Sequence, residues 1–312
     1  MGVVAVVVAS LLFAVNGTVS KLAMQAGLSP SHLVELRSLG SAVVLVAAAA
    51  LLAPRAALPR GRELAGLAVL GIVGMAMVQW LYFVAIERLP VGLALLIEYT
   101  APLLVALWAR VVLREAVRAR VWWALAACLG GLWLVAQVGA DVVLDVVGLV
   151  AAGAAAVALA TYYLLGDRLV RTRDPLTTQT WSMVFAAAFW CTVQPLWTVD
   201  TSVLGDDVGL PGALSGITVP LWLLVAWIVV LGTVVPYVLV LAGVARLGAA
   251  RTGVLGMLEP VAASATAWVV MGEAMTGVQL LGGLVVLAGV VLAETSRQRP
   301  AVTPAPDAVV SH

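Results

Sequence analysis

Four ionisable side chains lie inside long apolar runs of this sequence, namely Glu35, Arg37, Glu98 and Glu259. If such runs cross a membrane, a charged group within them costs about 2.5–3.5 kcal/mol on insertion scales and usually marks a functional site. A carboxylate can bind a proton, a cation or an ammonium group, and a guanidinium can hold a carboxylate through two parallel hydrogen bonds. These four residues are therefore the first candidates for a polar site.

Glu98 lies in an apolar run that also contains a proline. It precedes Pro102 by four residues, so both lie on one helix face. Pro102 has no N–H, and the carbonyl of residue 98 therefore loses its helical partner. A carboxylate and a free carbonyl at one depth can bind a proton, a cation or a substrate ammonium. The alternative is a protonated, buried Glu98 that hydrogen-bonds a neighbouring helix.

The other three ionisable residues also have structural alternatives. Glu259 directly precedes Pro260, and this pair can serve proton binding or simply shape the helix. Arg37 can anchor a substrate carboxylate, or it can pair with Glu35 or Glu98 to cancel charge. Residues two apart on a helix do not face each other, which disfavours a pair between Glu35 and Arg37. The candidates for proton coupling are Glu98, Glu35 and Glu259.

Uncharged polar and aromatic residues within the apolar runs extend the candidate site. Packing is the alternative role for each aromatic residue. Lys21, near the end of the first run, is expected to extend toward the membrane surface. Together with Glu98 and Arg37, the predicted substrate-binding residues are Asn16, Gln79, Tyr82, Tyr99, Tyr162, Trp181 and Tyr237.

The composition indicates a protein that spans a membrane many times. The chain has 312 residues, 63% of them hydrophobic, with a mean hydropathy of +1.11. Charged residues make up 11%, against about 25% in an ordinary soluble domain. These values exclude a soluble domain and a disordered chain. The two cysteines lie inside apolar runs, and the two histidines are too far apart to suggest a metal site or a catalytic triad.

Ten apolar runs are long enough to cross a bilayer, which needs about 20 helical residues per crossing. The predicted spans are 3–23, 32–53, 64–86, 91–110, 121–138, 146–166, 176–197, 219–243, 251–271 and 277–294.

Loop charges separate cleanly when ten spans are assumed. By the positive-inside rule, the arginine-rich side is cytoplasmic, and so are both termini. That side carries Arg55, Arg60, Arg62, Arg110, Arg114, Arg118, Arg120, Arg168, Arg171, Arg173, Arg246, Arg251, Arg297 and Arg299. The opposite side carries Glu87, Asp141, Asp145, Asp200, Asp206, Asp207 and Glu273, with Arg88 among its few basic residues.

Two segments of the chain align without gaps. ERLPVGLALLIEYTAPLLVALWARVVLREA begins at Glu87, and ARLGAARTGVLGMLEPVAASATAWVVMGEA begins at Ala245. In this alignment Pro102 meets Pro260, and Gln79 upstream meets Tyr237. Because each half then contains five spans, the second half enters the membrane the other way up. The predicted fold is an all-α polytopic membrane protein of ten transmembrane helices, in two inverted five-helix repeats around a central cavity.

This arrangement predicts three parts of the chain. Residues 1–140 form the first five-helix repeat, and residues 141–296 form the second, inverted one. Residues 297–312 form a Pro-rich, polar cytoplasmic tail that we expect to be disordered.

Three stretches of sequence carry a family resemblance. They are LLFAVNGTVSKLA from Leu11, the stretch from Leu258-Glu259-Pro260 to Gly272-Glu273, and AIERLPVGLALLIEYTAPLLVALWA from Ala85. With these motifs the chain resembles the drug/metabolite transporter superfamily, in particular its EamA-type members, from about residue 3 to 295. The third stretch is most similar to the threonine/homoserine exporter branch. The resemblance implies an inner-membrane exporter of small metabolites, built as two inverted halves around a central cavity.

The sequence therefore favours a secondary transporter that works by alternating access. No phosphate-binding Walker motif is present, so direct use of ATP is not expected. The transport is expected to export amino acids or related compounds, either coupled to protons through Glu98 or uncoupled. Multidrug efflux, metabolite exchange, a nucleotide-sugar carrier, a membrane enzyme and a non-transporting scaffold are alternatives. The expected partners are a small-molecule substrate, the lipid bilayer and a second copy in a homodimer, with no nucleic acid, cofactor or metal.

Overall fold

The computed structural model describes residues 1–53, 58–89, 91–114, 116–137, 145–194, 201–271 and 276–295. Several residues used in the charge argument lie outside these ranges, as does the predicted tail at 297–312. They are Arg55, Asp141, Asp200, Glu273, Arg297 and Arg299.

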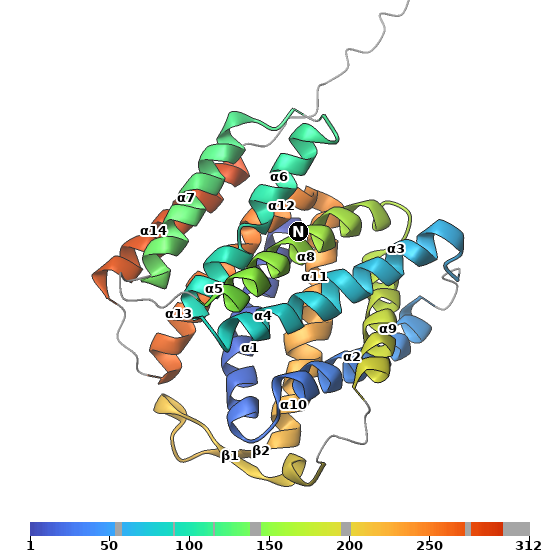
Figure 1. Ribbon diagram of the computed structural model, residues 1–312, viewed down its shortest axis with the longest axis vertical. Coiled ribbons are helices and arrows are strands. Elements are labelled where there is room, and N and C mark those ends of the chain that lie inside the picture. The colour runs from blue at the N-terminus through green and yellow to red at the C-terminus, as the bar shows by residue number, and fades with distance from the viewer. Residues whose placement is uncertain are drawn as a thin grey trace, which may run out of the picture.

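The described part of the chain consists mainly of helices (Figure 1). They are α1 (Gly2–Gln25), α2 (Pro30–Leu52), α3 (Gly61–Gly71), α4 (Val78–Ile86), α5 (Val91–Glu98), α6 (Ala101–Val111), α7 (Ala119–Ala136), α8 (Val146–Leu169), α9 (Pro175–Val193), α10 (Leu221–Val229), α11 (Val235–Leu247), α12 (Ala249–Gly256), α13 (Leu258–Met271) and α14 (Gly277–Thr295). Between α9 and α10 the strands β1 (Asp207–Gly209) and β2 (Thr218–Pro220) form an antiparallel hairpin in which Val208 pairs with Val219.

Seven helices in the described part are long and apolar enough to cross a membrane. They agree with seven of the ten predicted spans, while predicted spans 176–197, 251–271 and 277–294 correspond to α9, to α12 with α13, and to α14. α9 begins with PLTTQT, which lowers its hydropathy, and α13 is only 14 residues long. The chain is thus polytopic, and the count of ten remains a prediction.

Local sequence explains where several helices begin. The side chain of Ser29 accepts a hydrogen bond from the N–H of His32, and Pro30 follows at the first helical position of α2. Asp145 caps α8 by accepting from the N–H of Gly148 at 2.8 Å, and Asp174 caps α9 in the same way. Such caps supply acceptors for N–H groups that have no partner within the helix.

Two predicted spans are interrupted in the structure. The span predicted at 91–110 is split, because α5 ends at Glu98 and α6 begins at Ala101. Pro102 explains this break, since it cannot donate to the carbonyl of residue 98. The span predicted at 251–271 is also split, with α12 ending at Gly256 and α13 beginning at Leu258, two residues before Pro260.

Two other helices each contain a short π-helical segment. η1 (Ile72–Met77) lies between α3 and α4, and η5 (Val230–Val234) lies between α10 and α11. A π-helical segment is a one-residue insertion into a helix, and such segments often occur at functional sites. Both segments contain a glycine in contact with another helix, Gly74 in the first and Gly232 in the second.

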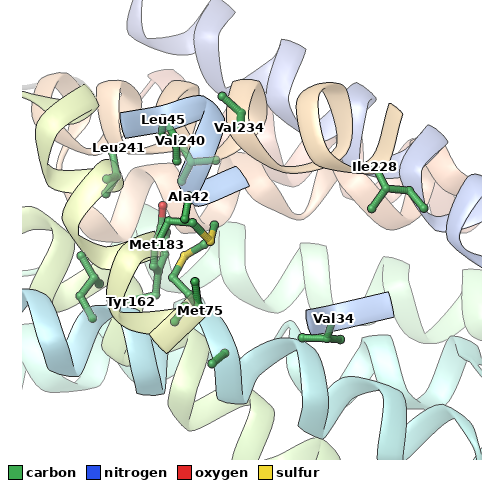
Figure 2. Close-up of a cluster of buried hydrophobic side chains, with 14 of the residues drawn as sticks. Val34, Ala42, Leu45, Met75, Tyr162, Met183, Ile228, Val234, Val240 and Leu241 are labelled. Carbon is green, nitrogen blue, oxygen red and sulfur yellow. The ribbon is translucent and has the colours of Figure 1, made fainter. Parts of the chain in front are cut away.

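The largest apolar core lies among helices from both parts of the chain. It joins α2, η1, α8, α9 and α11, which come from widely separated stretches of sequence. Figure 2 shows the side chains of Met75, Met183 and Tyr162 gathered beside Leu45 and Val240. α7 and α14 pack along each other at one edge of the molecule (Figure 1).

We expect a side chain at Gly131 to destabilise the protein through the contact between α7 and α14. A Cβ at this position would lie 2.6 Å from the carbonyl oxygen of Gly282, which is backbone and cannot rotate away. Gly131→Ala should therefore cost about 1–3 kcal/mol, the usual cost of overpacking, and lower the thermal midpoint in detergent. Gly130→Ala is the matched control, because a Cβ there meets nothing within 4 Å. Equal midpoints for the two variants would contradict the expectation.

Candidate functional site

A cavity of about 540 Å³ lies where helices from the two parts of the chain meet. α1, α4, α5, α8, α11 and α13 supply most of its wall. It holds both basic and acidic side chains, because Arg37, Glu98 and Glu259 all line it. Its other polar or aromatic lining residues are Phe13, Asn16, Thr18, Ser20, Lys21, Gln79, Tyr82, Phe83, Tyr99, Tyr162, Tyr163 and Tyr237.

Most of the residues predicted from sequence lie together in this cavity. Two candidates do not line it. Trp181 on α9 is half-buried and packs against the main apolar core. Glu35 on α2 is fully buried away from the cavity. The predicted residues found in the lining are Asn16, Arg37, Gln79, Tyr82, Glu98, Tyr99, Tyr162, Tyr237 and Glu259.

Arg37 is held by the π-helical segment of the second part of the chain. Its Nε donates to Thr233 Oγ1 at 3.1 Å, and its Nη2 donates to the carbonyl of Gly232 at 3.3 Å. The carbonyl of Gly232 is available because Pro236, four residues later, has no N–H to donate. Among the described residues neither Glu35 nor Glu98 is a partner of this guanidinium, so the alternative in which Arg37 pairs with one of these carboxylates does not hold here.

The two carboxylates of the cavity have different surroundings. Glu259 Oε2 accepts a hydrogen bond from the hydroxyl of Tyr99 at 2.6 Å. Glu98 is only 8% exposed and lines the cavity at the last residue of α5, where the helix is broken. Because Tyr99 follows Glu98 directly in the chain, one tyrosine lies next to both acidic groups. The arrangement can bind a cation or exchange a proton.

A group of tyrosines forms another part of the wall. The side-chain amide of Gln79 donates to the hydroxyl of Tyr237 at 3.4 Å. The ring centroids of Tyr162 and Tyr237 are 5.6 Å apart, and those of Phe13 and Tyr237 are 4.9 Å apart, both in edge-to-face geometry. These rings provide apolar surface with a few fixed polar groups, which is typical of small-molecule sites.

The reasoning from sequence identified only Asn16 on the face of α1 that lines the cavity. Phe13, Asn16, Gly17, Ser20, Lys21 and Met24 all line the cavity. Their spacing is that of a single helical face, so the pattern was present in the sequence. Lys21 is exposed and also lines the cavity, so the cavity reaches the protein surface near the end of α1. Tyr163 lines it as well, next to the predicted Tyr162.

The described residues do not offer a metal centre. Among them, no group of three or more His, Cys, Asp or Glu side chains is placed to hold a metal ion. The groups that line the cavity are a guanidinium, two carboxyl groups and several hydroxyl groups, which can bind the polar groups of a small organic molecule.

Several apolar helices around a chamber that holds a few charged and polar side chains define a multi-pass membrane protein. The chain belongs to the EamA-like transporter family, whose model matches residues 1–137 and 146–295. This membership assigns it to a family of transporters rather than to a family of enzymes.

Individual proteins that this chain is similar to are also named as transporters. The chain is 31% identical over 211 residues to the threonine/homoserine exporter RhtA of Salmonella typhimurium, and 31% identical over 210 residues to that of Escherichia coli K12. Each match covers 67% of this chain and spans 64% of the length of the exporter. An uncharacterized transporter of Archaeoglobus fulgidus is 28% identical over 232 residues, covering 74% of this chain and 76% of that protein.

A solved crystal structure has the same fold. It superposes with a TM-score of 0.74 at 20% identity and covers 94% of this chain and 96% of the other. At this identity the likeness concerns the arrangement of the helices alone.

Proposed function

We propose that this protein exports small metabolites that carry both a carboxylate and an ammonium group, with amino acids as the main class. The observation that carries the proposal is the presence of Arg37, Glu98 and Glu259 in one cavity of about 540 Å³. The guanidinium suits a carboxylate, and the acidic groups suit an ammonium. The named function of the two bacterial relatives, export of threonine and homoserine, supports the same class of substrate.

The proposed architecture is ten membrane spans in two inverted halves, residues 1–140 and 141–296, followed by a cytoplasmic tail at 297–312. The family model matches the chain in two segments, which supports this division. The helix breaks support it too, because Glu98 and Gly256 end α5 and α12 at positions 158 residues apart. The π-helical segments η1 and η5 begin at Ile72 and Val230, with the same separation.

Matched contacts between helices also support the repeat. A Cβ on Gly2 would lie 3.0 Å from Leu247 Cγ, and a Cβ on Gly148 would lie 2.8 Å from Leu89 Cγ. Leu89 and Leu247 are partners in the sequence alignment, and Gly2 and Gly148, which are 146 residues apart, both lie in the first turn of their helices, α1 and α8. A two-fold relation between halves produces every such contact twice.

The same pairing recurs inside the molecule. A Cβ on Gly232 would collide with Asn16, and a Cβ on Gly74 would lie 3.0 Å from Tyr162 Cβ. Gly74 and Gly232 are 158 residues apart, whereas Asn16 and Tyr162 are 146 apart, like Gly2 and Gly148. The bond from Gln79 to Tyr237 joins two partners that are themselves 158 residues apart, as expected near a two-fold axis.

We place both termini in the cytoplasm and the chain in the bacterial inner membrane. Contacts near the helix ends support the grouping of the loops on two sides, and the positive-inside rule assigns the arginine-rich side to the cytoplasm. Arg173 pairs with Glu63 at 2.9 Å, which brings the α8–α9 turn to the start of α3, and both lie on the predicted cytoplasmic side. Arg88 and Asp145, both assigned to the opposite side, lie 3.8 Å apart.

The proposed mechanism is alternating access, with protons as the coupling ion and Glu98 as their carrier. A proton on Glu98 removes the negative charge that attracts a substrate ammonium, so proton and substrate compete for one group. Uncoupled efflux down the substrate gradient is the competing mechanism. The homodimer expected from the sequence stays a prediction.

Glu98→Gln is the test of proton coupling. We expect proteoliposomes with wild-type protein to move labelled L-threonine faster when a pH gradient is imposed. The amide introduced by this substitution cannot take up the proton, so the variant should lose this dependence on the gradient. Glu87→Gln is the matched control, because Glu87 is an exposed acid outside the cavity. Gradient-driven transport by Glu98→Gln would remove Glu98 as the carrier.

The proposed export function is tested separately in cells. Cells that overproduce the protein are fed dipeptides, and the medium is assayed for a panel of amino acids. Release of one or a few amino acids by wild-type protein, but not by Glu98→Ala, supports the proposal. Release of none, together with resistance to toxic compounds, would favour multidrug efflux.

A further inference from the structure

A second pocket lies apart from the central cavity, at the ends of several helices. Its volume is about 450 Å³, and it lies among the ends of α6, α8 and α11 and the start of α12. Three arginines line it, Arg168, Arg171 and Arg251, together with one acidic residue, Asp167. Arg171 pairs with Asp167 at 2.7 Å. The lining therefore carries more positive than negative charge, over apolar walls formed by Val105, Ala109 and Leu164.

We infer a layer of side chains between this pocket and the central cavity from neighbouring residues that line the two. Tyr163 lines the cavity, and Leu164, the next residue, lines the second pocket. A Cβ on Gly253 would lie 3.2 Å from Pro102 Cβ, and a Cβ on Gly256 would lie 2.9 Å from the hydroxyl of Tyr163. The layer therefore consists of close contacts with glycines, at the two places where α5–α6 and α12–α13 are broken.

The repeat relates the second pocket to the opposite end of the cavity. Thr18 and Lys21 line the cavity where it reaches the surface, and residues 146 positions later, Leu164 and Asp167, line the second pocket. Residues separated by 158 positions show the same relation. Ala263 lines the cavity, and Val105, its partner 158 residues earlier, lines the pocket. If the two inverted halves exchanged conformations, the pathway would open at this pocket and close at the end where the cavity now reaches the surface.

We propose that the second pocket is the cytoplasmic mouth of the transport pathway and binds the carboxylate of the outgoing substrate through Arg168 and Arg251. The inference rests on the proposed export function and adds a second binding site to it. Guanidinium groups hold carboxylates through paired N–H groups, and excess positive charge at a pocket raises the local concentration of anions. The substrate would pass from this site to Arg37 when the layer at Gly253 and Tyr163 opens.

Transport into inside-out membrane vesicles measures capture from the cytoplasmic face. We expect Arg168→Gln and Arg251→Gln each to raise the KM for L-threonine about fivefold, the effect of losing one partly exposed charge interaction. kcat should change little, because the central site is intact. Arg168→Lys, which keeps the charge but loses the paired N–H groups, should recover only part of the affinity. Arg246→Gln is the matched control, since this exposed arginine lies outside the pocket and donates to the carbonyl of Ala242.

A second measurement separates this inference from the proposed function. Leu164→Cys is made in a Cys191→Ser background, because Cys191 is the exposed native cysteine and Cys128 is buried. A charged, impermeant thiol reagent should label the introduced thiol from the cytoplasmic face, and L-threonine should slow the labelling. Unchanged KM values in both glutamine variants, or labelling only from the opposite face, would overturn the inference while wild-type transport continues. If the wild-type protein transports neither L-threonine nor any other amino acid, the proposed function itself is overturned.

Discussion

Arg37→Lys should reduce transport of L-threonine by about 10- to 100-fold, although it keeps the positive charge. The lysine ammonium cannot reproduce the fork by which Arg37 holds Thr233 Oγ1 at 3.1 Å and the carbonyl of Gly232 at 3.3 Å. A hydrogen bond to a charged group contributes about 1.5–3 kcal/mol, which corresponds to that range of rates. The ammonium group of the introduced lysine would therefore be misplaced relative to the substrate carboxylate.

The measurement is the initial rate of L-threonine transport into proteoliposomes. The rate is normalised to the amount of folded protein, which is determined by size-exclusion chromatography. Arg246→Lys is the matched exchange at the surface, where the arginine donates to the carbonyl of Ala242 in its own helix, and it should transport normally. Thr233→Val provides an independent check, because it removes one acceptor of Arg37 without touching the arginine. If Arg37→Lys transports as well as wild type, the fork plays no part in transport.

Arg37 also shows how far the sequence could predict the site. A guanidinium in an apolar run is conspicuous, so its placement as a candidate needed no structure. Its partners could not be predicted, because Gly232 and Thr233 lie 195 and 196 residues away. The sequence did contain one clue, since Pro236 frees the carbonyl of residue 232 by the same logic that was applied to Pro102.

Trp181 and Glu35 illustrate the opposite case. Both have the residue types and the depth expected of site residues, yet Trp181 packs against the core and Glu35 is buried away from the cavity. In a soluble helix, a polar face identifies which side is outward and hence which side is inward. A helix in lipid is apolar on both sides, so depth can be estimated from sequence while direction cannot. α1 was the exception, because Asn16, Ser20 and Lys21 follow a helical period.

The breaks in helices were easier to predict than the ends of helices. Proline acts locally through its missing N–H, so Pro102 and Pro260 indicated irregular backbone at the right depths. Helix ends depend on contacts with other elements, and α9 stops at Val193 although its apolar run was expected to continue to residue 197. Of the two π-helical segments, only η5 has such a local signal, because Pro236 frees the carbonyl of Gly232 within it, whereas η1 contains no proline.

Gly232→Ala should strongly destabilise the folded protein and also disturb the transport site. A Cβ at this position would collide with Asn16 Oδ1 and lie 2.5 Å from Asn16 Cγ, far inside van der Waals contact. Rotation of the amide about χ2 cannot relieve a clash with Cγ, so either Asn16 must change its χ1 rotamer and leave its place in the cavity wall, or α1 must move away from η5. Because Arg37 donates to the carbonyl of Gly232, the same movement displaces the guanidinium. We expect a loss of about 3 kcal/mol or more in stability and no measurable transport.

The double variant Asn16→Ala with Gly232→Ala separates packing from binding. Removing Cγ and Oδ1 leaves only Asn16 Cβ, which is 3.2 Å from the added methyl group, a distance that a small shift can accommodate. Thermal stability in detergent should therefore recover in the double variant, as a positive coupling in a double-mutant cycle. Gly153→Ala, where a Cβ meets nothing within 4 Å, is the control for the methyl group itself.

Transport by the double variant decides the role of Asn16. If Asn16 only fills space between α1 and η5, transport should return together with stability. If its amide contacts the substrate, as its place in the cavity lining suggests, stability should return while the KM for L-threonine stays raised. A Gly232→Ala protein with wild-type stability would contradict the close approach of the two helices, and with it the position of Arg37 that depends on this approach.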